Sequence, residues 1–330
     1  MTIRANLSIS LIPLLLACLC SGQTPERLSP REIAERTASS LVVLVNFDSA
    51  GRAASFGSGF VAAPSVVLTN YHVIRGASRI GVMIGHDPVY ADAILGYSPE
   101  QDVAALHAPL PQTVAALTLA DSSLVKVGDH VITMGAPQGY ERTLGDGLVS
   151  GIRVLGRVRR FQITAPISHG SSGGPVLNDY GQVVGLAVSS NEKGELLNFA
   201  APTSEAVAAL GDVRLISFPD LLRETLVEQP ASNTTFTVPP GRVVPYVIDV
   251  PQQGATCSGS YTVSGGVGND VIVSVVGPDQ KLVIQPSLVK ALGTLNLPFA
   301  GGRYLLVFDN RRSLVSAKSI SPSLTLRYYR

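Results

Sequence analysis

Residues 170–175 read GSSGGP, a serine set between glycines at the start of an apolar run. A serine hydroxyl becomes an acyl-transfer nucleophile only if a base removes its proton and fixed donors stabilise the oxyanion. Gly170 and Gly173 allow a tight turn in which the N–H groups of Gly170 and Ser172 point at one spot beside the Ser172 hydroxyl. Taken alone, the string also fits a Ser/Gly-rich hairpin turn, so its meaning depends on the rest of the chain.

Two stretches upstream supply the partners that such a serine needs. Residues 68–74, LTNYHVI, end an expected strand on His72, and residues 101–106, QDVAAL, open the next apolar strand on Asp102. The order His72, Asp102, Ser172, with separations of 30 and 70 residues, is that of a trypsin-like triad. In that arrangement neutral His72 accepts the serine proton and passes it to the leaving amine. Asp102 fixes the tautomer of His72 and stabilises the imidazolium.

The composition predicts a mostly β protein. The chain has 330 residues, 45% of them hydrophobic and 15% charged, with 32 Gly, 22 Pro and no Trp. This mixture favours short strands joined by Gly/Pro turns. The net charge is +1, from 25 basic and 24 acidic residues, which argues against a nucleic-acid partner. The composition alone goes no further than this class; the strand count and the resemblance described below lead us to expect two six-stranded antiparallel β-barrels of the trypsin-like kind, followed by a C-terminal β-sandwich.

The first 22 residues have the pattern of a secretory signal peptide. Arg4 precedes an apolar run over residues 11–19, which is far short of the roughly 20 residues that a membrane span needs. Two cleavage sites stay open. One is a lipoprotein box at residues 15–18, LLAC, where Cys18 would be lipidated, and the other is ordinary cleavage near Gly22. We therefore expect an exported protein, periplasmic or extracellular, whose contact with a membrane is limited to a lipid anchor on Cys18.

The remaining cysteine and the scattered histidines predict no metal site and no cofactor. A chain cut near residue 22 keeps only Cys257, which we interpret as structural, and forms no intramolecular disulfide. His86, His107 and His130 lack ligand spacing. His169 is interpreted as an exposed loop residue because the base role already has an occupant.

The chain divides into a protease-like part and a second β-rich part. Ser29, Pro30 and Glu32 form a capping box that predicts a helix to about residue 39. Strands are expected at residues 41–45, 55–62, 65–69, 79–84, 91–97, 103–107, 130–134, 147–154, 160–164, 174–178, 183–188 and 197–201. This count suits two consecutive barrels within a domain over residues 29–215. Helices are expected at residues 203–210 and 219–226.

The amino-acid mix changes at Ala231. Eight strand candidates with Gly-rich turns follow within residues 231–330, which predicts a separate β-sandwich. Residues 216–230 are expected to be a helical linker.

These motifs together resemble the HtrA (Deg) branch of trypsin-like serine proteases over about residues 32–205. The matching segments, in the family's order, are residues 57–60, 68–74, 102–106, 135–139, 147–150, 170–176, 181–185 and 198–202. The resemblance implies the triad His72, Asp102 and Ser172, with Gly170 and Ser172 as oxyanion donors. It also implies a serine endopeptidase that acts on unfolded or extended polypeptides through an acyl-enzyme.

Three departures from the family are visible. No PDZ domain follows the protease part, and Ser171 stands where digestive trypsins carry an aspartate for zymogen activation. No Ile-Val-Gly-Gly start is present, so activation by cutting a new N-terminus is not expected. The C-terminal part loosely resembles GOLD-like or accessory β-sandwich domains of secreted peptidases, chiefly through residues 302–310.

The resemblance also implies that residues 161–171 help to build the pocket for the residue before the scissile bond, and this stretch contains no Asp or Glu. A buried Lys or Arg side chain of a substrate would lack a partner there. Ile167, Ala187 and Val188 are expected to form an apolar wall, which favours small or medium aliphatic side chains at the residue before the scissile bond.

A second hypothesis is that the chain has the protease fold but does not hydrolyse peptide bonds. The protease-like part is then a catalytically silent or autoinhibited peptide-binding scaffold, and the sandwich binds a surface or a partner. The intact triad and glycine turn favour the enzyme, because a pure binder has no physical need for all of them. Polypeptides are the expected partners under both hypotheses, and a homo-oligomer stays open.

Overall fold

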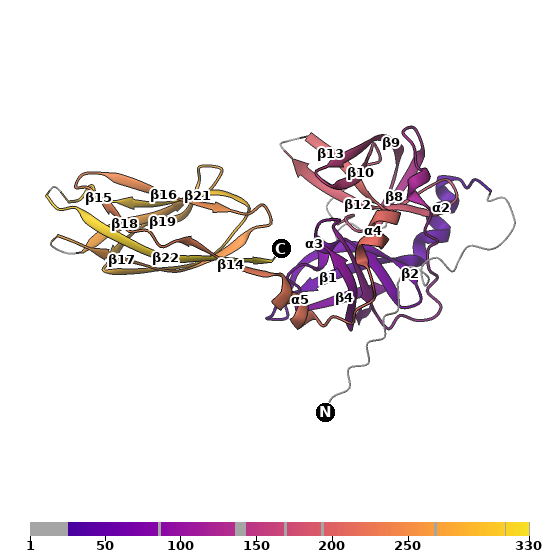
Figure 1. Ribbon diagram of the computed structural model, residues 1–330, viewed down its shortest axis with the longest axis horizontal. Helices are drawn as coiled ribbons and strands as arrows, with labels where there is room; N and C mark the ends of the chain where they lie inside the picture. Colours follow the sequence, from indigo (N-terminus) through magenta and orange to yellow (C-terminus); the bar gives the residue numbers. More distant parts are fainter. Residues whose placement is uncertain are drawn as a thin grey trace, which may run out of the picture. The chain divides into compact units, whose positions relative to one another are not determined.

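The computed structural model describes residues 26–84, 87–135, 143–167, 170–192, 195–266, 269–313 and 315–329. The chain forms two compact units that divide after Arg223 (Figure 1). The expected signal segment with Cys18, His86, His169 and most of the motif at 135–139 lie outside the described residues. Among the helices that are described, none combines the length and the apolar character that crossing a membrane requires.

The first helix confirms the capping box. In α2 (Pro30–Thr37), Ser29 is the N-cap, its side chain accepts from the Glu32 N–H, and the Glu32 carboxylate accepts from the Ser29 N–H. Pro30 adds the preset φ of a first helical position. A 3₁₀ turn, η1 (Ala38–Ser40), then leads directly into the first strand.

The first unit begins with a seven-stranded antiparallel sheet in the order β5-β4-β1-β2-β3-β7-β6. Its strands are β1 (Leu41–Phe47), β2 (Ala53–Ala63), β3 (Val66–Thr69), β4 (Arg79–Ile84), β5 (Asp87–Tyr90), β6 (Ala93–Ser98) and β7 (Val103–His107). Leu44, Ile80 and Leu106 are among its fully buried core residues. Six strands were expected in this part of the chain. The additional strand β5 pairs with β4 as a short hairpin, and its four residues, one of them proline, carry little strand signal.

The second sheet closes into a six-stranded barrel in the order β10-β13-β12-β11-β8-β9. Its strands are β8 (His130–Gly135), β9 (Thr143–Leu155), β10 (Val158–Ile163), β11 (Pro175–Leu177), β12 (Val183–Glu192) and β13 (Glu195–Pro202). The helix α4 (Thr203–Leu210), at the expected residues, follows β13. In Figure 1 the strands β1, β2 and β4 gather in one half of this unit and β8, β9, β10 and β13 in the other.

A shared core joins the two sheets. Phe60 and Leu68 of the first sheet belong to one buried cluster with Ile132 and Leu186 of the barrel. Burial of this cluster fixes the position of one sheet against the other, because the apolar area is removed from water only when both are present. The candidate site lies along this junction.

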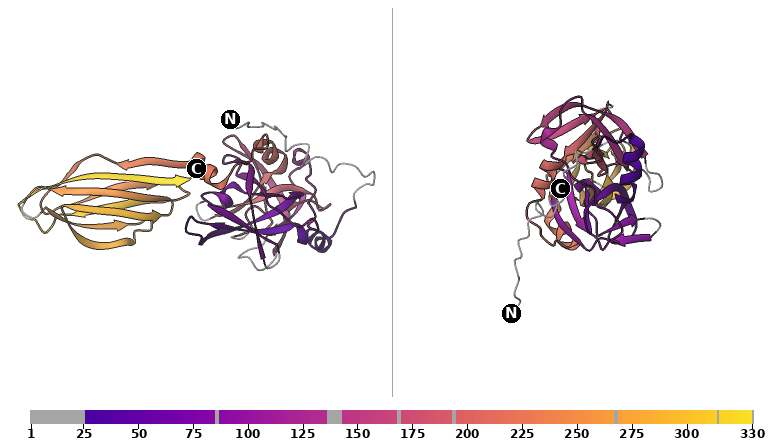
Figure 2. Two further views of the ribbon diagram at one scale, coloured as in Figure 1. Left: turned by 90° about the horizontal axis from the view of Figure 1, so that it is seen from below. Right: turned by 90° about the vertical axis from the view of Figure 1, so that its right-hand side faces the viewer.

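The second unit is a two-sheet β structure. Its strands are β14 (Leu226–Ser232), β15 (Phe236–Val238), β16 (Val243–Val250), β17 (Ala255–Ser264), β18 (Asp270–Val276), β19 (Leu282–Lys290), β20 (Leu292–Phe299), β21 (Gly302–Asp309) and β22 (Lys318–Tyr329). One sheet has the order β14-β22-β17-β20 with β15 on β22, and the other β16-β21-β18-β19. Figure 2 shows these strands running side by side along the unit. Phe308 and Cys257 are fully buried in its core.

The segment 216–230 differs from the expected helical linker. Its first half, with Ile216 and Leu221, packs into the core of the first sheet, and α5 (Phe218–Thr225) covers only part of it. Its second half is strand β14, which pairs with β22 of the second unit. The two units therefore divide after Arg223 rather than at 230, because the first half of the segment is buried in the core of the first sheet and the second half pairs with β22.

Candidate active site

His72 lies on a four-residue helix between two strands of the first sheet. The helix α3 (Tyr71–Ile74) starts at Asn70, directly after β3. Tyr71, Val73 and Ile74 are buried in the sheet's core, whereas the His72 side chain is 36% exposed. The three apolar side chains thus anchor the helix and leave the imidazole at its surface.

Asp102 holds His72 at two points. Its Oδ2 lies 2.7 Å from Nδ1 of the imidazole, and its Oδ1 accepts from the main-chain N–H of His72 at 2.9 Å. An ionised carboxylate only accepts hydrogen bonds, so Nδ1 carries the proton and Nε2 is left as the acceptor. This is the tautomer that a general base for a serine hydroxyl requires.

The turn that carries Ser172 is tied to the first sheet. Gly170 and Gly173 have φ values of +95° and +85°, which favour glycine. The carbonyl oxygen of Ser172 accepts from the Ser58 N–H of β2 at 2.8 Å, and the carbonyl oxygen of Gly170 accepts from the Ser58 hydroxyl at 2.6 Å. One residue of the first sheet therefore fixes two points of the turn that precedes β11.

Close approach at Gly173 brings this turn against the histidine turn. A Cβ at Gly173 would overlap the Ser58 carbonyl oxygen and the Thr69 hydroxyl, and would lie 2.9 Å from the Asn70 nitrogen. Thr69 and Asn70 immediately precede α3. The fold thus packs the Ser172 turn directly onto the residues that lead to His72.

Further residues of the site were given no catalytic part from the sequence, although Asn70 was expected to support the histidine turn. The Asn70 side-chain amide donates to the Asp102 carbonyl oxygen at 2.8 Å. On β10, Arg160 donates to both the carbonyl oxygen and the side-chain oxygen of Gln101. Asn70 and Ser58 stand inside the strings TNYH and GSGF, which marked this region, but nothing in the sequence pointed to Arg160.

The three residues expected to line an apolar wall differ in exposure. Ile167 is partly buried and packs against the barrel's core, and Val188 packs against the shared core. Ala187 is only 1% exposed, and its N–H and carbonyl are bonded to Gly174 and Gly173. Ala187 therefore supports the Ser172 turn through its main-chain hydrogen bonds, and its side chain offers almost no surface to a substrate.

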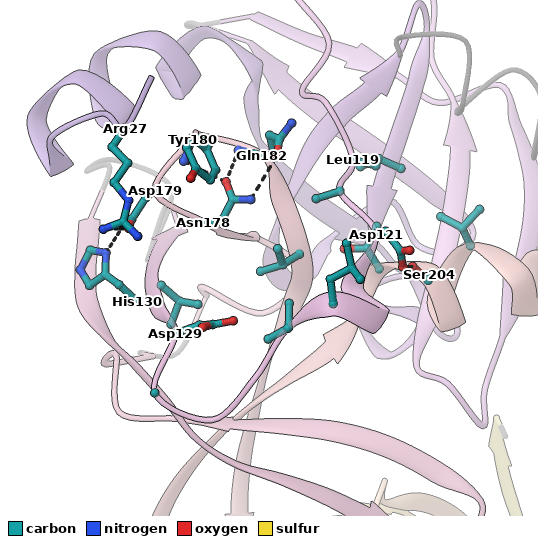
Figure 3. A pocket seen from close by; sticks show the side chains of 18 of the residues that line it. Arg27, Leu119, Asp121, Asp129, His130, Asn178, Asp179, Tyr180, Gln182 and Ser204 are labelled. Atoms are coloured by element: carbon teal, nitrogen blue, oxygen red, sulfur yellow. Dashed lines mark hydrogen bonds and ion pairs between the residues drawn. The ribbon is translucent and has the colours of Figure 1, made fainter. Parts of the chain in front are cut away.

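A cavity of about 1010 Å³ lies elsewhere in the first unit (Figure 3). It is bounded by the start of β8, the turn between β11 and β12, and α4. Arg27, His130 and Asp179 gather at one end, and Asp121 and Ser204 lie at the other. No member of the expected triad lines it.

His130 is bonded through both ring nitrogens. Nδ1 lies 2.5 Å from Asp179 Oδ1, and Nε2 lies 2.5 Å from Asp146 Oδ1. Partial burial opposes protonation of the ring, but the bonds to Asp179 and Asp146 outweigh it and raise the pKa of His130 above its usual value. The ring thus links β8, β9 and the turn after β11, and its two carboxylate partners favour its protonated form.

Within the ranges that the structure describes, no group of three or more His, Cys, Asp or Glu side chains is arranged to hold a metal ion. The chemistry available at the candidate site is that of a serine hydroxyl, an imidazole and a carboxylate. Such a set performs proton transfer and nucleophilic attack.

Comparison with known proteins agrees with this geometry. Residues 57–186 match the family described as trypsin-like peptidase domain. The periplasmic serine endoprotease DegP of Salmonella typhimurium is 32% identical over 160 residues, which cover 46% of this chain and 34% of DegP. A probable DegP-like periplasmic endoprotease of Pseudomonas putida is 29% identical over 294 residues, 84% of this chain and 59% of that protein. This chain thus spans less than two thirds of either relative.

A solved HtrA-type protease, a variant of AlgW with a tripeptide, superimposes with a TM-score of 0.50 and 27% identity, covering 55% of this chain and 62% of that protein. The matched residues run from within β2 to within β12, the stretch that carries His72, Asp102 and Ser172. The first unit is therefore similar to trypsin-like serine protease domains of the HtrA type, and residues 57–186 carry the match to the trypsin-like peptidase domain.

Proposed function

We propose that this chain is an exported serine endopeptidase that hydrolyses peptide bonds of unfolded or extended polypeptides through an acyl-enzyme. The observation that carries the proposal is the two-point contact of Asp102 with His72, next to the packed turn of Ser172. This arrangement supplies a base of defined tautomer beside a serine on a tight turn. Both are needed before a hydroxyl can attack an amide.

The reaction then runs in two halves. His72 Nε2 takes the Ser172 proton as Oγ attacks the substrate carbonyl, and the N–H groups of Gly170 and Ser172 donate to the oxyanion. The imidazolium, stabilised by Asp102, passes its proton to the leaving amine. A water molecule, deprotonated by the same base, hydrolyses the ester and restores the Ser172 hydroxyl.

The proposed preference is for a small or medium aliphatic side chain before the scissile bond. Residues 161–167 and 170–171 contain no carboxylate that could partner a substrate Lys or Arg. Ile167 is only partly buried against the barrel's core, so part of its apolar side chain stays exposed. An uncharged, apolar lining penalises a buried cation.

Export is proposed from residues 1–22 together with the relatives, which are named periplasmic. Lipidation of Cys18 and cleavage near Gly22 remain the two alternatives for the mature N-terminus. Mass spectrometry of the mature chain distinguishes the two cleavage sites, because only the first leaves a diacylated cysteine.

The test of the reaction uses the purified chain and its Ser172→Ala variant. Each is treated with a fluorophosphonate probe and, separately, with a disordered protein substrate. We expect labelling and cleavage in the wild-type chain and neither in the variant, at matched melting temperatures. The matched control is Ser150→Ala, which changes an exposed serine on β9 and is expected to keep both activities.

The second candidate function, a silent or autoinhibited peptide-binding scaffold, makes the opposite prediction. A folded wild-type chain that neither reacts with the probe nor cleaves the substrate contradicts the peptidase proposal. Binding of the uncleaved disordered substrate by both the wild-type chain and Ser172→Ala would then favour the scaffold.

A further inference from the structure

Asp102 adopts a backbone conformation that only a minority of non-glycine residues adopt. Its φ is +52°, in the left-handed region. Such a conformation is strained and persists only where the surroundings determine it. The orientation of the carboxylate toward His72 depends on this conformation, since Asp102 is bonded to both the ring and the main-chain N–H of His72.

Side chains from two different parts of the unit hold the peptide groups on both sides of Asp102. The Asp102 carbonyl oxygen accepts from Asn70 Nδ2 at 2.8 Å. The preceding carbonyl oxygen, that of Gln101, accepts from Arg160 Nη2 at 3.1 Å, and Gln101 Oε1 accepts from Arg160 Nη1 at 3.1 Å. Asn70 is the N-cap of α3, directly after β3 of the first sheet, whereas Arg160 lies on β10 of the barrel.

Arg160 is placed where a guanidinium is costly. The residue is 8% exposed, and burial lowers the pKa of Arg160, an effect that the charges of Asp102 and Glu205 oppose. Among the salt bridges of the described residues, none includes Arg160. Its hydrogen bonds go to the two oxygens of Gln101 and to the Arg159 carbonyl, at distances of 3.0–3.1 Å. The planar fork therefore meets a fixed set of acceptors, which a flexible ammonium cannot reproduce.

We propose that Arg160 is a positioning residue for the triad: its two bonds to Gln101 fix the peptide before Asp102 and couple the carboxylate's orientation to the packing of the barrel on the first sheet. Arg160 touches neither His72 nor the substrate in this role. The inference rests on the proposed peptidase function, because it assigns Arg160 to the same proton-transfer step. It predicts that Asp102 loses its alignment on His72 when the fork is removed, even if positive charge is kept.

The test compares Arg160→Lys and Arg160→Met with the matched control Arg159→Lys. Arg159 is the neighbouring residue on β10 and binds Glu205 at 2.9 Å instead of Gln101. We expect kcat and the rate of fluorophosphonate labelling to fall about 10- to 100-fold in both Arg160 variants, as for a misplacement of about 1 Å. KM for a peptide substrate should stay unchanged, and Arg159→Lys should keep wild-type values.

A second readout does not require activity. Proton NMR at low temperature follows the Nδ1–H of His72, whose resonance is shifted far downfield while it donates to Asp102. We expect this resonance to move upfield or broaden in both Arg160 variants and to persist in Arg159→Lys. If Arg160→Met does not fold, as judged by its melting transition, the kinetic and the NMR measurements are both made on Arg160→Lys.

The outcomes separate this proposal from the peptidase proposal. Wild-type kcat and an unchanged His72 resonance in Arg160→Lys would overturn the role of the fork, since charge alone would then suffice. Equal losses in Arg159→Lys and Arg160→Lys would also overturn it, because the effect would belong to β10 in general. A wild-type chain without activity contradicts the peptidase proposal, and the NMR comparison still decides whether Arg160 aligns Asp102 on His72.

Discussion

The side-chain amide of Asn70 donates to the main-chain carbonyl of Asp102 at 2.8 Å, so the residue two places before His72 also holds the backbone of its partner. Asn70 is fully buried, and its Oδ1 is one of two buried side-chain acceptors without a hydrogen-bond partner among the described residues. An unpaired buried acceptor costs about 1–3 kcal/mol. Asn70 therefore orients Asp102 at the expense of stability.

Replacing Asn70 should separate activity from stability. In Asn70→Ala the Asp102 carbonyl loses its donor, and the unpaired Oδ1 disappears with it. We expect kcat to fall about tenfold, in line with a lost positioning contact, while the free energy of unfolding changes by about 1 kcal/mol or less. Substrate turnover and thermal unfolding measure the two effects.

The control for this prediction is Asn178→Ala, in the turn between β11 and β12, where the side chain bonds to Gln182 and Tyr180. It should leave kcat unchanged. A wild-type kcat in Asn70→Ala would show that Asp102 keeps its orientation without this donor.

Gly173→Ala should abolish activity by moving the Ser172 turn. The added methyl would overlap the Ser58 carbonyl and the Thr69 hydroxyl, so the turn must shift away from the histidine helix. We expect a loss of labelling of at least about 100-fold. Gly128→Ala is the matched control, because Gly128 has a φ of +96° but no atom within 4 Å of the added methyl. Both variants carry the strain of positive φ, about 1–2 kcal/mol, so equal losses would assign the effect to strain instead of overlap.

The raised pKa of His130 predicts a pH-dependent stability. A group whose pKa is higher in the folded state contributes stability that is present below its unfolded pKa, about 6.5, and is lost as pH rises through the folded value. His130→Gln should therefore destabilise the first unit more at pH 5.5 than at pH 9. The contribution is about 1 kcal/mol at most, because the ring is 32% exposed and its ion pairs are screened.

Chemical denaturation of the wild-type chain and of His130→Gln at both pH values measures this difference. Groups that titrate identically in the two proteins cancel. A difference in unfolding free energy that is constant with pH, or larger at pH 9, would show that the contacts with Asp146 and Asp179 do not favour protonation of His130.

The Cys257 thiol should be inert in the folded protein. Burial in the core of the second unit raises the pKa of Cys257 to about 11, so little thiolate exists at neutral pH. We expect a thiol reagent to modify Cys257 at pH 8 only at the rate at which the second unit opens, and rapidly in denaturant. Rapid modification without denaturant would mean that this core is open in solution.

Local patterns in the sequence determined most of the secondary-structure elements and identified the residues that could carry a reaction. The capping box at Ser29, the helix at residues 203–210 and the strands on both sides of the triad follow from spacing and turn residues within a few positions of each other. The pairing of His72 with Asp102 was predicted from their order and separation, and the two side chains are in contact. Strand β5 and the boundary after Arg223 were missed, because the first has weak propensity and the second depends on which core buries Ile216 and Leu221.

Only the tertiary structure decided what holds the triad. Ser58 lies 112 residues from Gly170, and Arg160 lies 59 residues from Gln101, yet each pair is in direct contact across the junction of the two sheets. Residue type and local spacing carry no information on such contacts, since they exist only when the shared core of Phe60, Leu68, Ile132 and Leu186 brings the sheets together. The same limit applies to Ala187, an apolar residue next to the serine turn. The closed barrel, and not the neighbouring residues in the sequence, sets the orientation of Ala187 and leaves it buried.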